Sequence, residues 1–404
     1  MEAQLLVVGA GPAGSLAAEQ AAKNGCKVLV LEQRATIGSP DHCAGLISVS
    51  GLEKLGITKL PDEVIQNKNV VGAKFFSPSG KNFIVRRKSS QAYVIDRELF
   101  DQHLAEKAQN AGAEIFTNMK VKKITTKPNL SFTCKERDTK KNHQVNTTLG
   151  ILAEGRSGLL AQSVGFRAVK RKHRYSGYQL LVENVRDLDV NFVEIHASNE
   201  FAPGFFTWII PIDETTAKVG LASSEQQVVS RMKNFMNKHP PVKDRFTKAK
   251  ITKSYAGQVI VGGLVRKTVK DNLITVGDTA GQTKATTGGG VIIGGIAGSL
   301  AGKYAAKIVD DQGNMKHLLK QYDKDWRSLL EKQLRSMKRF RKLVDLLKDK
   351  AYDMAFDTVI ENDLVSLIEQ KGDIDSQAEV LRAILKHPAV WKLAFKVIPH
   401  LKLL

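Results

Sequence analysis

Three glycines near the N-terminus have the spacing of a site that binds a phosphorylated ligand. The segment Gly9-Ala10-Gly11-Pro12-Ala13-Gly14 lies between a short apolar run and an alanine-rich stretch. In such a segment the first glycine permits a tight turn, the second lets the backbone approach a pyrophosphate, and the third allows close helix–strand packing. The helix start that follows offers free N–H groups to the phosphates. This segment is therefore predicted to hold a dinucleotide through Gly9, Gly11, Pro12, Ala13 and Gly14.

Glu32 argues against NADP as the ligand of this site. It ends the second apolar run, eighteen residues after Gly14, where a carboxylate can accept hydrogen bonds from a ribose. The same negative charge would repel a 2′-phosphate, which argues against NADP. Gln33 and Arg34 follow directly, and we expect them to contact the cofactor as well.

A second glycine-rich segment, far downstream, favours FAD over NAD. Gly277-Asp278 ends another apolar run and is followed by Gly288-Gly289-Gly290. The aspartate can hold the ribityl or pyrophosphate part of a flavin, and the N–H groups of a helix start can stabilise its anionic reduced form. The chain has one GxGxxG motif, so we expect no separate nicotinamide domain and a donor that docks transiently.

The elements that must position these residues follow from the apolar pattern. Short apolar runs are typical of buried strands, and apolar residues three to four apart are typical of helices. We predict strands at 5–8, 28–31, 73–76, 82–85 and 273–276, and helices at 15–23, 95–110 and 291–309. Residues 1–31 therefore form a strand–helix–strand unit with a right-handed crossover.

The last hundred residues are predicted to be helical. Apolar residues recur there at helical spacing and alternate with basic ones; they are Trp326, Leu329, Leu330, Leu334, Met337, Phe340, Val344 and Leu347. Packing of this stripe against the body of the protein is the expected explanation, and contact with a membrane surface is the alternative.

Composition sets the remaining limits. The 404 residues include 61 Lys and Arg against 41 Asp and Glu, a formal net charge of +20 that suits an anionic membrane surface or anionic substrate. Cys26, Cys43 and Cys134 have no metal-ligand spacing, so we predict no metal site and no disulfide framework. We see no nucleic-acid module, signal peptide or long apolar span. A cytoplasmic protein is expected, with peripheral contact at the inner face of the cell membrane as one interpretation of the charge.

Several motifs together resemble one branch of the flavoproteins. Besides the glycine segments, they are Asp96-Arg97-x-x-Phe100-Asp101 and Ala153-Glu154-Gly155-Arg156-Ser157-Gly158. They resemble the hydroxylase-like FAD-dependent oxidoreductases, and within them the geranylgeranyl reductase family, in particular the archaeal digeranylgeranylglycerophospholipid reductases. The resemblance runs from residue 1 to about 345 and implies cofactor contacts at Arg97, Glu154 and Gly155.

The same resemblance implies the fold and its division. An α/β fold is expected, with a Rossmann-type FAD domain made of 1–70, 90–165 and 265–310. A substrate domain with an antiparallel sheet would comprise 71–89 and 166–264, and a helical region would comprise 311–404.

Two segments carry the narrower match to the family. The segment 39–48 is similar to a cysteine-containing loop that lies near the flavin, which implicates Cys43, Ala44 and Gly45. Phe206-x-Trp208-x-x-Pro211 with Val219-Gly220 is similar to a substrate-site motif whose aromatic rings flank an isoprenoid chain. Core packing of Trp208 and an inert thiol at Cys43 are the structural alternatives.

The chain also departs from the family pattern at several positions. Glu154 replaces the usual aspartate, Lys284-Ala285 stands where a proline is common, and Ile210 replaces a frequent phenylalanine. These differences leave the flavin contacts intact but weaken the assignment of a particular substrate.

The resemblance implies an enzyme that saturates carbon–carbon double bonds of geranylgeranyl chains in archaeal-type membrane lipid precursors. A hydride would come from flavin N5 and a proton from Cys43, His42 or a water. The expected partners are a prenylated glycerolipid and an electron donor, either ferredoxin, reduced nicotinamide or quinol. The basic clusters 86–88 and 170–174 are candidates to meet an anionic headgroup, with a solvated loop as the alternative for each.

Two other functions remain open from the sequence. Trp208-Ile209-Ile210-Pro211 also looks like half of a halogenase motif, so a flavin-dependent monooxygenase or halogenase is the first alternative. Against it, Phe206 stands where the motif has a second tryptophan, and we find no convincing catalytic lysine. A prenyl-lipid carrier that retains FAD without catalysis is the second.

Overall fold

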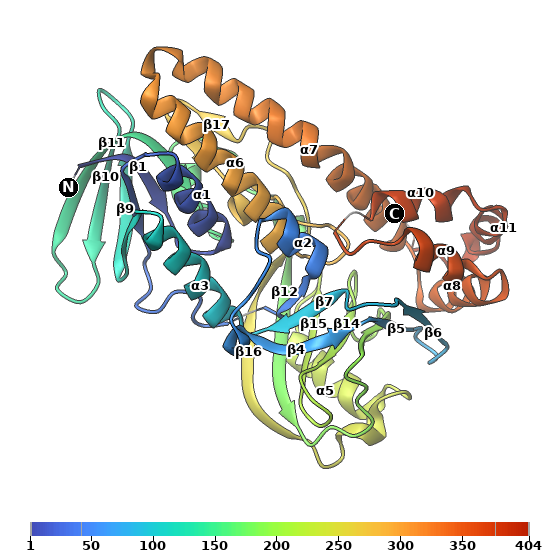
Figure 1. Ribbon diagram of the computed structural model, residues 1–404. Coiled ribbons are helices and arrows are strands. Elements are labelled where there is room, and N and C mark those ends of the chain that lie inside the picture. The colour runs from blue at the N-terminus through green and yellow to red at the C-terminus, as the bar shows by residue number, and fades with distance from the viewer. Residues whose placement is uncertain (1, 42, 376, 403–404) are drawn as a thin grey trace.

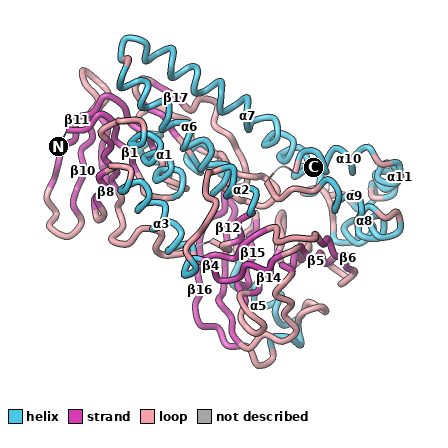
Figure 2. The backbone as a smooth tube through the Cα atoms, viewed as in Figure 1, coloured by secondary structure: helices cyan, strands magenta, loops and turns pink. Residues whose placement is uncertain are grey.

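A computed structural model describes residues 2–41, 43–375 and 377–402. It has three sheets, with helices packed on the first and a helical region at one end of the molecule (Figures 1 and 2). The predicted α/β class, with a Rossmann-type unit and a separate largely antiparallel sheet, is confirmed.

The first sheet carries the glycine loops at the ends of its parallel strands. Its strand order is β17-β18-β11-β1-β2-β8, and β9 and β10 form an antiparallel extension that pairs with β11. The bounds are β1 Glu2–Val8, β2 Val28–Leu31, β8 Glu114–Phe116, β9 Met119–Thr125, β10 Ser131–Glu136, β11 Asn142–Leu152, β17 Val269–Lys270 and β18 Leu273–Thr275. Side chains of β1 alternate between two cores, Leu5 and Val7 toward the helices and Leu6 toward the extension, so the strand is apolar throughout.

The helices α1 (Pro12–Lys23) and α6 (Val291–Asp310) cross closely over this sheet. A side chain at Gly298 or Gly302 of α6 would overlap the carbonyl oxygens of Ala13 or Ala17. By length and a mean hydropathy of 1.2, α6 could span a membrane, yet 67% of that window is buried inside the protein. Its apolar character is therefore explained by the core.

A third helix, α3 (Arg97–Asn110), packs beside α1. It begins two residues later than predicted because the Asp96 side chain accepts hydrogen bonds from the N–H groups of Glu98 and Leu99 and caps the helix. Conversely, α1 begins earlier than predicted, at Pro12, since proline is well suited to the first turn.

The largely antiparallel sheet has the order β16-β12-β15-β14-β13-β5-β6. The bounds are β5 Gly72–Phe76, β6 Asn82–Arg86, β12 Arg174–Glu183, β13 Phe192–His196, β14 Thr207–Pro211, β15 Ala217–Ser223 and β16 Lys250–Ile260. One face packs on α5 (Val228–Lys238), and the opposite face contacts the small sheet of β3 (Leu46–Ser48), β7 (Ala92–Ile95) and β4 (Ile65–Val70). All seven strands fall in the ranges predicted for the substrate domain; the domain boundaries themselves stay a prediction.

The helical region begins with α7 (Met315–Val344), which runs beside α6 (Figure 1). Trp326, Leu330, Leu334 and Met337 are buried, so packing explains that part of the predicted stripe, while Leu329 is 62% exposed. The other helices are α2 Val49–Lys54, α4 Leu159–Ser163, α8 Asp349–Glu361, α9 Leu364–Lys371, α10 Ala378–Lys386 and α11 Pro388–Lys396.

Candidate active site

The N-terminal glycine segment forms a cradle at the start of α1. Gly9 has φ +102°, and a side chain at Gly9 or Gly14 would collide with the backbone of Ala153 or Gly9. Gly11 differs, because within the described chain nothing lies within 4 Å of the place where its Cβ would stand. No described side chain caps the helix start. The loop is thus packed against the protein at Gly9 and Gly14 and open at Gly11, which fits a pyrophosphate bound at the helix N-terminus.

Glu32 is fastened to this cradle. Its Oε2 accepts a hydrogen bond of 3.0 Å from the N–H of Ala10, and its Oε1 accepts one of 2.9 Å from the N–H of Arg34. These bonds hold the carboxylate beside the glycine loop, where a ribose is expected.

Gln33 and Arg34 lead away from the cradle. The Gln33 carbonyl oxygen accepts a hydrogen bond from Arg137, and the Arg34 guanidinium donates to the carbonyl oxygen of Ser39. An open cleft of about 620 Å³ is lined by Arg34, Ser39, Pro40, Arg137 and Lys140 among others. It borders the predicted cofactor segment on its outer side and is distinct from the glycine cradle.

Three segments far apart in sequence meet at the carboxyl ends of the parallel strands. Gly277 has φ +66° and abuts Ala13 of the cradle, while the N–H of Ala153 donates to the carbonyl oxygen of Val8. Ligands of open α/β sheets bind at this edge. The structure therefore brings Gly9–Gly14, Ala153–Gly155 and Gly277–Asp278 together, as a single cofactor site requires.

Asp278 is half-buried at this edge of the sheet. Among the described residues none donates a hydrogen bond to it, and burial raises its pKa while the charge of Arg97 acts in the opposite direction. A half-buried carboxylate without protein donors can accept hydrogen bonds that a ligand supplies. The hydroxyl groups of a ribityl chain would do so, which makes this group a good test of fit for FAD.

Gly288, Gly289 and Gly290 lead into α6, whose N-terminus has no side-chain cap among the described residues. Lys284 joins this loop to the C-terminal region, because its Nζ lies 2.7 Å from Asp375 Oδ1 and 3.1 Å from the carbonyl oxygen of Ile374. Both charged side chains are almost fully buried. Lys284, which departs from the family pattern, thus forms an ion pair with the C-terminal region.

Glu154 performs a local task. Its carboxylate accepts hydrogen bonds of 2.9 and 2.8 Å from the N–H groups of Leu160 and Ala161, and thereby caps α4. The side chain thus caps a helix, and the cofactor contact that the resemblance implied for Glu154 stays a prediction. Gly155, with φ +62° and open space before it, can still offer its backbone.

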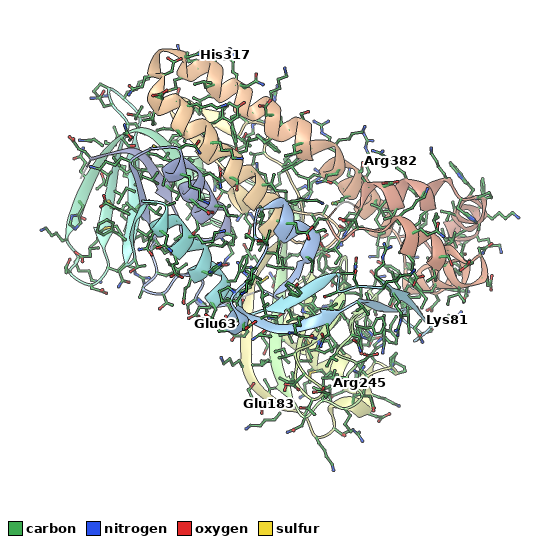
Figure 3. The ribbon with its side chains drawn as sticks, viewed as in Figure 1. Glu63, Lys81, Glu183, Arg245, His317 and Arg382 are labelled. Carbon is green, nitrogen blue, oxygen red and sulfur yellow. The ribbon has the colours of Figure 1, made fainter. Side chains whose placement is uncertain are left out.

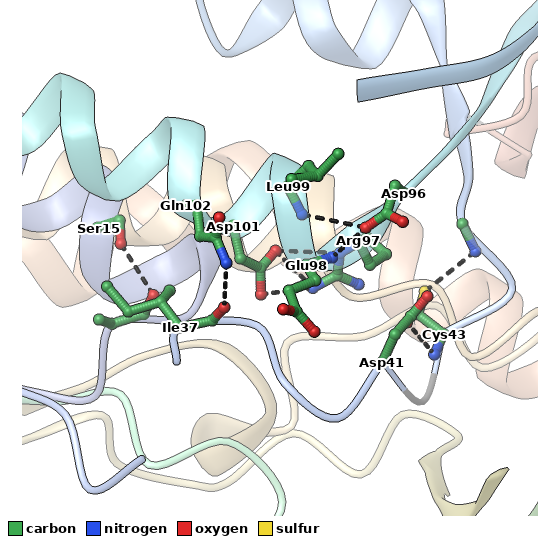
Figure 4. Close-up of polar contacts among 12 residues, drawn as sticks. Ser15, Ile37, Asp41, Cys43, Asp96, Arg97, Glu98, Leu99, Asp101 and Gln102 are labelled. Atoms are coloured by element: carbon green, nitrogen blue, oxygen red, sulfur yellow. Dashed lines mark hydrogen bonds and ion pairs between the residues drawn. The ribbon is translucent and has the colours of Figure 1, made fainter. Parts of the chain in front are cut away.

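Arg97 forms a buried ion pair at the start of α3 (Figure 4). Its Nη2 lies 2.9 Å from Asp101 Oδ1 and 3.0 Å from Oδ2. Burial raises the pKa of Asp101 to about 6, against the lowering influence of Arg97. Burial would lower the pKa of Arg97, but Asp101 and further acidic groups raise it overall. The guanidinium stays charged and lies near Asp278 and the Cys43 loop.

The Cys43 loop is joined to the substrate-side sheet by Gln179, which the sequence did not single out. Gln179 Nε2 donates to the carbonyl oxygen of Cys43 at 2.9 Å, and Trp208 Nε1 donates to Gln179 Oε1 at 3.2 Å. The two segments that carry the narrower family match are therefore linked through one buried amide. A polar residue at a buried strand position was the available signal.

The thiol of Cys43 is held within its own loop. The N–H of Cys43 donates to Asp41 Oδ1 at 2.8 Å, and the N–H of Gly45 approaches Cys43 Sγ at 3.4 Å (Figure 4). Gly45 has φ +75° and packs on the carbonyl oxygen of Ile95, and Ala44 packs against the cluster around Trp208. Cys43 is partly exposed, unlike Cys26 and Cys134, which are buried.

Trp208 and Phe206 belong to an aromatic group. Phe206 stacks on Phe205 with a centroid distance of 4.2 Å and meets Trp208 edge-on at 6.0 Å. Gly220 lies opposite Trp208 on β15, and any side chain there would overlap the indole ring. Trp208 is 9% exposed, so much of its surface is core.

Lys218 is a second residue that the sequence did not reveal. It is 5% exposed on β15, and its Nζ donates to the carbonyl oxygen of Ile95 at 2.9 Å and lies 3.9 Å from Asp41 Oδ2. Burial lowers its pKa, although Asp41 acts in the opposite direction. Lys218 thus joins the Cys43 loop, through Asp41, to the same sheet as Gln179 does.

Comparison with known proteins decides the family. A model described as an FAD binding domain matches residues 2–332. The digeranylgeranylglycerophospholipid reductase of Methanocaldococcus jannaschii is 32% identical over 402 residues, which cover 96% of each chain. The chain belongs to the geranylgeranyl reductase family of FAD-dependent oxidoreductases. A protein named digeranylgeranylglycerophospholipid reductase 1 from Methanosphaera stadtmanae is 28% identical over 408 residues, covering 100% of this chain and 97% of that protein.

Solved structures share the fold. A geranylgeranyl bacteriochlorophyll reductase-like protein of Thermoplasma acidophilum matches with a TM-score of 0.85 and 24% identity over 98% of this chain and 99% of that one. A flavin-dependent brominase matches with a TM-score of 0.72 and 18% identity over 98% of this chain and all of that one. The predicted family, FAD cofactor and oxidoreductase class are confirmed. The roles of individual site residues stay predictions.

Proposed function

We propose that this protein saturates the carbon–carbon double bonds of geranylgeranyl chains in archaeal-type membrane lipid precursors. The observation that supports this most is the hydrogen-bond chain from the Cys43 loop through Gln179 to Trp208. It couples the loop proposed to face the flavin with the aromatic group proposed to face the lipid. The names of the archaeal relatives point the same way.

Reduction of an isolated alkene requires a hydride on one carbon and a proton on the other. Reduced FAD supplies the hydride when it is bound. The alkene has no carbonyl group to polarise, so the chain's own contribution is to position the double bond and exclude water. The rings of Phe206 and Trp208 would flank the isoprenoid chain. Because Gly220 seats the indole and Gln179 binds its N–H, the ring would keep one orientation.

We propose Cys43 as the proton donor. A thiol can hold a proton at Sγ, and the loop that carries it is held by a hydrogen bond from Gln179 and by the contact of Lys218 with Asp41. His42, the other side chain considered from the sequence, lies outside the described residues.

We also propose that the protein is cytoplasmic. We further propose that it receives electrons from a transiently docked ferredoxin, reduced nicotinamide or quinol, since the sequence has one dinucleotide motif.

The basic cluster 86–88 is a poor site for a lipid headgroup. Arg86 lies over the ring of Phe192, with its Cζ 4.7 Å from the ring centroid, and Arg87 donates to the carbonyl oxygens of Ile368 and Gly372. Both arginines thus fasten the edge of the sheet.

Anaerobic turnover with dithionite and a geranylgeranyl glycerophospholipid tests this proposal. Each reduced double bond adds one hydride and one proton, so mass spectrometry should show a gain of about two mass units per bond. Cys43→Ala should slow the reaction while retaining flavin, and Cys134→Ala, which alters a buried thiol far from the loop, serves as the matched control.

Other products would contradict the proposal. An oxygen-dependent gain of an oxygen or halogen atom would favour the monooxygenase or halogenase, whose fold the chain shares. Lipid that binds tightly and is recovered unchanged from the reduced enzyme would favour a carrier.

A further inference from the structure

The C-terminal helix α11 exposes an apolar stripe at one end of the molecule. Trp391 is 62% exposed, Phe395 72% and Ile398, in the short turn that follows the helix, 60%. The spacing of four and three residues places these side chains along one side of a helix. Figure 1 shows α11 at the end of the molecule farthest from the N-terminus. We call Trp391, Phe395 and Ile398 the apolar tip.

Basic side chains flank the apolar tip. Lys392 and Lys396 directly follow two of its members and are exposed, as is Lys386 at the end of α10. Within the described residues, no carboxylate forms an ion pair with any of these three lysines. Arg382 lies on the outer side of α10 (Figure 3). Residues 378–402 contain five Lys and Arg and one acidic residue, Glu379.

The stripe is held in place from both sides. Val397 is 6% exposed, and α11 packs against α8 and α10. The chain that follows is fastened to the body, because the N–H of Lys402 donates to the carbonyl oxygen of Leu346 at 2.7 Å and Lys402 Nζ donates to Asn199 Oδ1 at 2.6 Å. The aromatic side chains are therefore presented on a fixed support.

We propose that the apolar tip docks on an anionic phospholipid bilayer. Exposed aromatic residues beside lysines match the two parts of such a surface, since the rings enter the headgroup boundary while the ammonium groups contact the phosphates. A second copy of the chain would fit less well, because it would bring the same unpaired lysines face to face. Charge complementarity therefore selects the lipid surface.

The docking surface is connected to the proposed active site. Asp375 and Gln377, shortly before α10, bind the glycine-rich loop that precedes α6. Asp375 pairs with Lys284 at 2.7 Å, and Gln377 Oε1 accepts a hydrogen bond from Thr286 Oγ1. Ile374 packs against the cluster around Trp208. If the substrate is a membrane lipid, which rests on the proposed function, docking here would bring the bilayer to the helical region that supports the site.

Vesicle sedimentation of the holoenzyme tests the docking. Wild type should pellet with vesicles of phosphatidylglycerol and phosphatidylcholine in equal parts, and less with phosphatidylcholine alone or at high salt. Trp391→Ser with Phe395→Ser should lower the partition coefficient by about tenfold to a hundredfold, since two large apolar side chains no longer leave water. Leu329→Ser, which alters an equally exposed apolar residue on α7, should bind as wild type does.

Tryptophan emission gives a readout that does not depend on how the double variant folds. Trp208 and Trp326 are buried, so a blue shift on adding anionic vesicles should come from Trp391 and disappear in Trp391→Phe. An unchanged emission, or a double variant that folds and binds as wild type does, would overturn the proposal. So would a dimer that depends on the two aromatic residues in a protein that does not bind vesicles. Sedimentation involves no turnover, so its failure would leave the proposed reaction intact, and the converse also holds.

Discussion

Gln179 is the residue whose role depends most on its surroundings. Its amide group accepts from Trp208 and donates to the backbone of Cys43, and it is 4% exposed. A buried amide that makes both bonds holds its neighbours at fixed distances, whereas an apolar residue of the same size would leave a buried N–H and a buried carbonyl group unsatisfied. We therefore regard it as a positioning residue for both segments.

Replacement of Gln179 by leucine tests this role. The loss of two buried hydrogen bonds, at about 1 kcal/mol each, should lower turnover of the prenyl lipid by roughly tenfold or more, while flavin absorbance of the purified protein stays the same. Gln312→Leu, which alters an exposed glutamine beyond α6, should leave turnover unchanged. Equal activity of Gln179→Leu and wild type would remove the positioning role.

At the level of elements, the crossing of α1 and α6 determines the shape of the cofactor cradle. The start of α1 carries the glycine segment, and the start of α6 carries Gly288–Gly290, so the distance between the helices controls both ends of the site. Gly298 and Gly302 let the backbones of the two helices approach, because a Cβ at either would overlap a carbonyl oxygen of α1.

Gly298→Ala should therefore separate the helices. The new methyl group would overlap the carbonyl oxygen of Ala13, and overpacking of this kind costs about 1–3 kcal/mol. We expect a lower melting temperature and partial loss of FAD, measured by calorimetry and by flavin absorbance after gel filtration. Gly313→Ala is the control, since its Cβ would make only an ordinary contact at 3.6 Å. A Gly298→Ala protein as stable and as yellow as wild type would contradict the packing argument.

A histidine network lies between the end of α5 and the largely antiparallel sheet. His239 Nε2 lies 3.1 Å from His196 Nδ1, and His196 Nε2 lies 3.2 Å from Glu194, which also pairs with Arg245. Burial lowers the pKa of His239 to about 3, and His196 acts in the same direction. The folded protein therefore keeps His239 neutral at pH values where the unfolded chain binds a proton.

The sign of this effect gives a pH prediction. A histidine whose folded pKa lies below its unfolded value stabilises the protein above about pH 6.5, and this contribution is lost as the pH falls toward about 3. For His239 the loss between pH 7 and pH 5 amounts to about 2 kcal/mol. The drop in melting temperature over that range should be smaller in His239→Phe than in wild type. His317→Gln, on the exposed side of α7, should show the wild-type drop, and an equal drop in all three proteins would refute the assignment.

On the scale of the whole molecule, a buried ion pair joins the C-terminal region to the glycine-rich loop that precedes α6. Lys284 and Asp375 are 91 residues apart, and Asp375 also accepts a hydrogen bond from Ser48 at the start of α2. Removal of one partner from a buried pair is costly because the other charge stays behind. The helical region should therefore influence cofactor binding although it contributes no glycine loop.

A double-mutant cycle measures this connection. Asp375→Leu should destabilise the protein by about 3–5 kcal/mol and weaken FAD retention, because Lys284 stays buried without a partner. The double variant Lys284→Met with Asp375→Leu should recover most of the loss, since an apolar pair replaces the buried charges. If the two single changes proved additive, the pair would carry no coupling and the C-terminal region would be independent of the glycine-rich loop that precedes α6.

Secondary structure was predictable from the sequence at several places, whereas the contacts of individual side chains were not. The strands at 5–8 and 28–31 and the helix at 291–309 were predictable, since an apolar run or a helical period is written in adjacent residues. The capping of α4 by Glu154 was not predictable, because the N–H groups of Leu160 and Ala161 reach its carboxylate only in the folded chain. The apolar period over 326–337 correctly indicated packing, whereas the exposure of Trp391 on α11 does not follow from the sequence pattern.

By itself, the sequence determined the family, the FAD cofactor and the α/β fold, because glycine spacing and apolar period encode turns, strands and helix starts locally. Only the tertiary structure decided that Gln179 and Lys218 fasten the Cys43 loop, that Lys284 pairs with Asp375, and that Asp278 has no described donor. These contacts join residues on different strands and helices. They depend on strand register and on which faces become buried, and neither is set by residues that are neighbours in the chain.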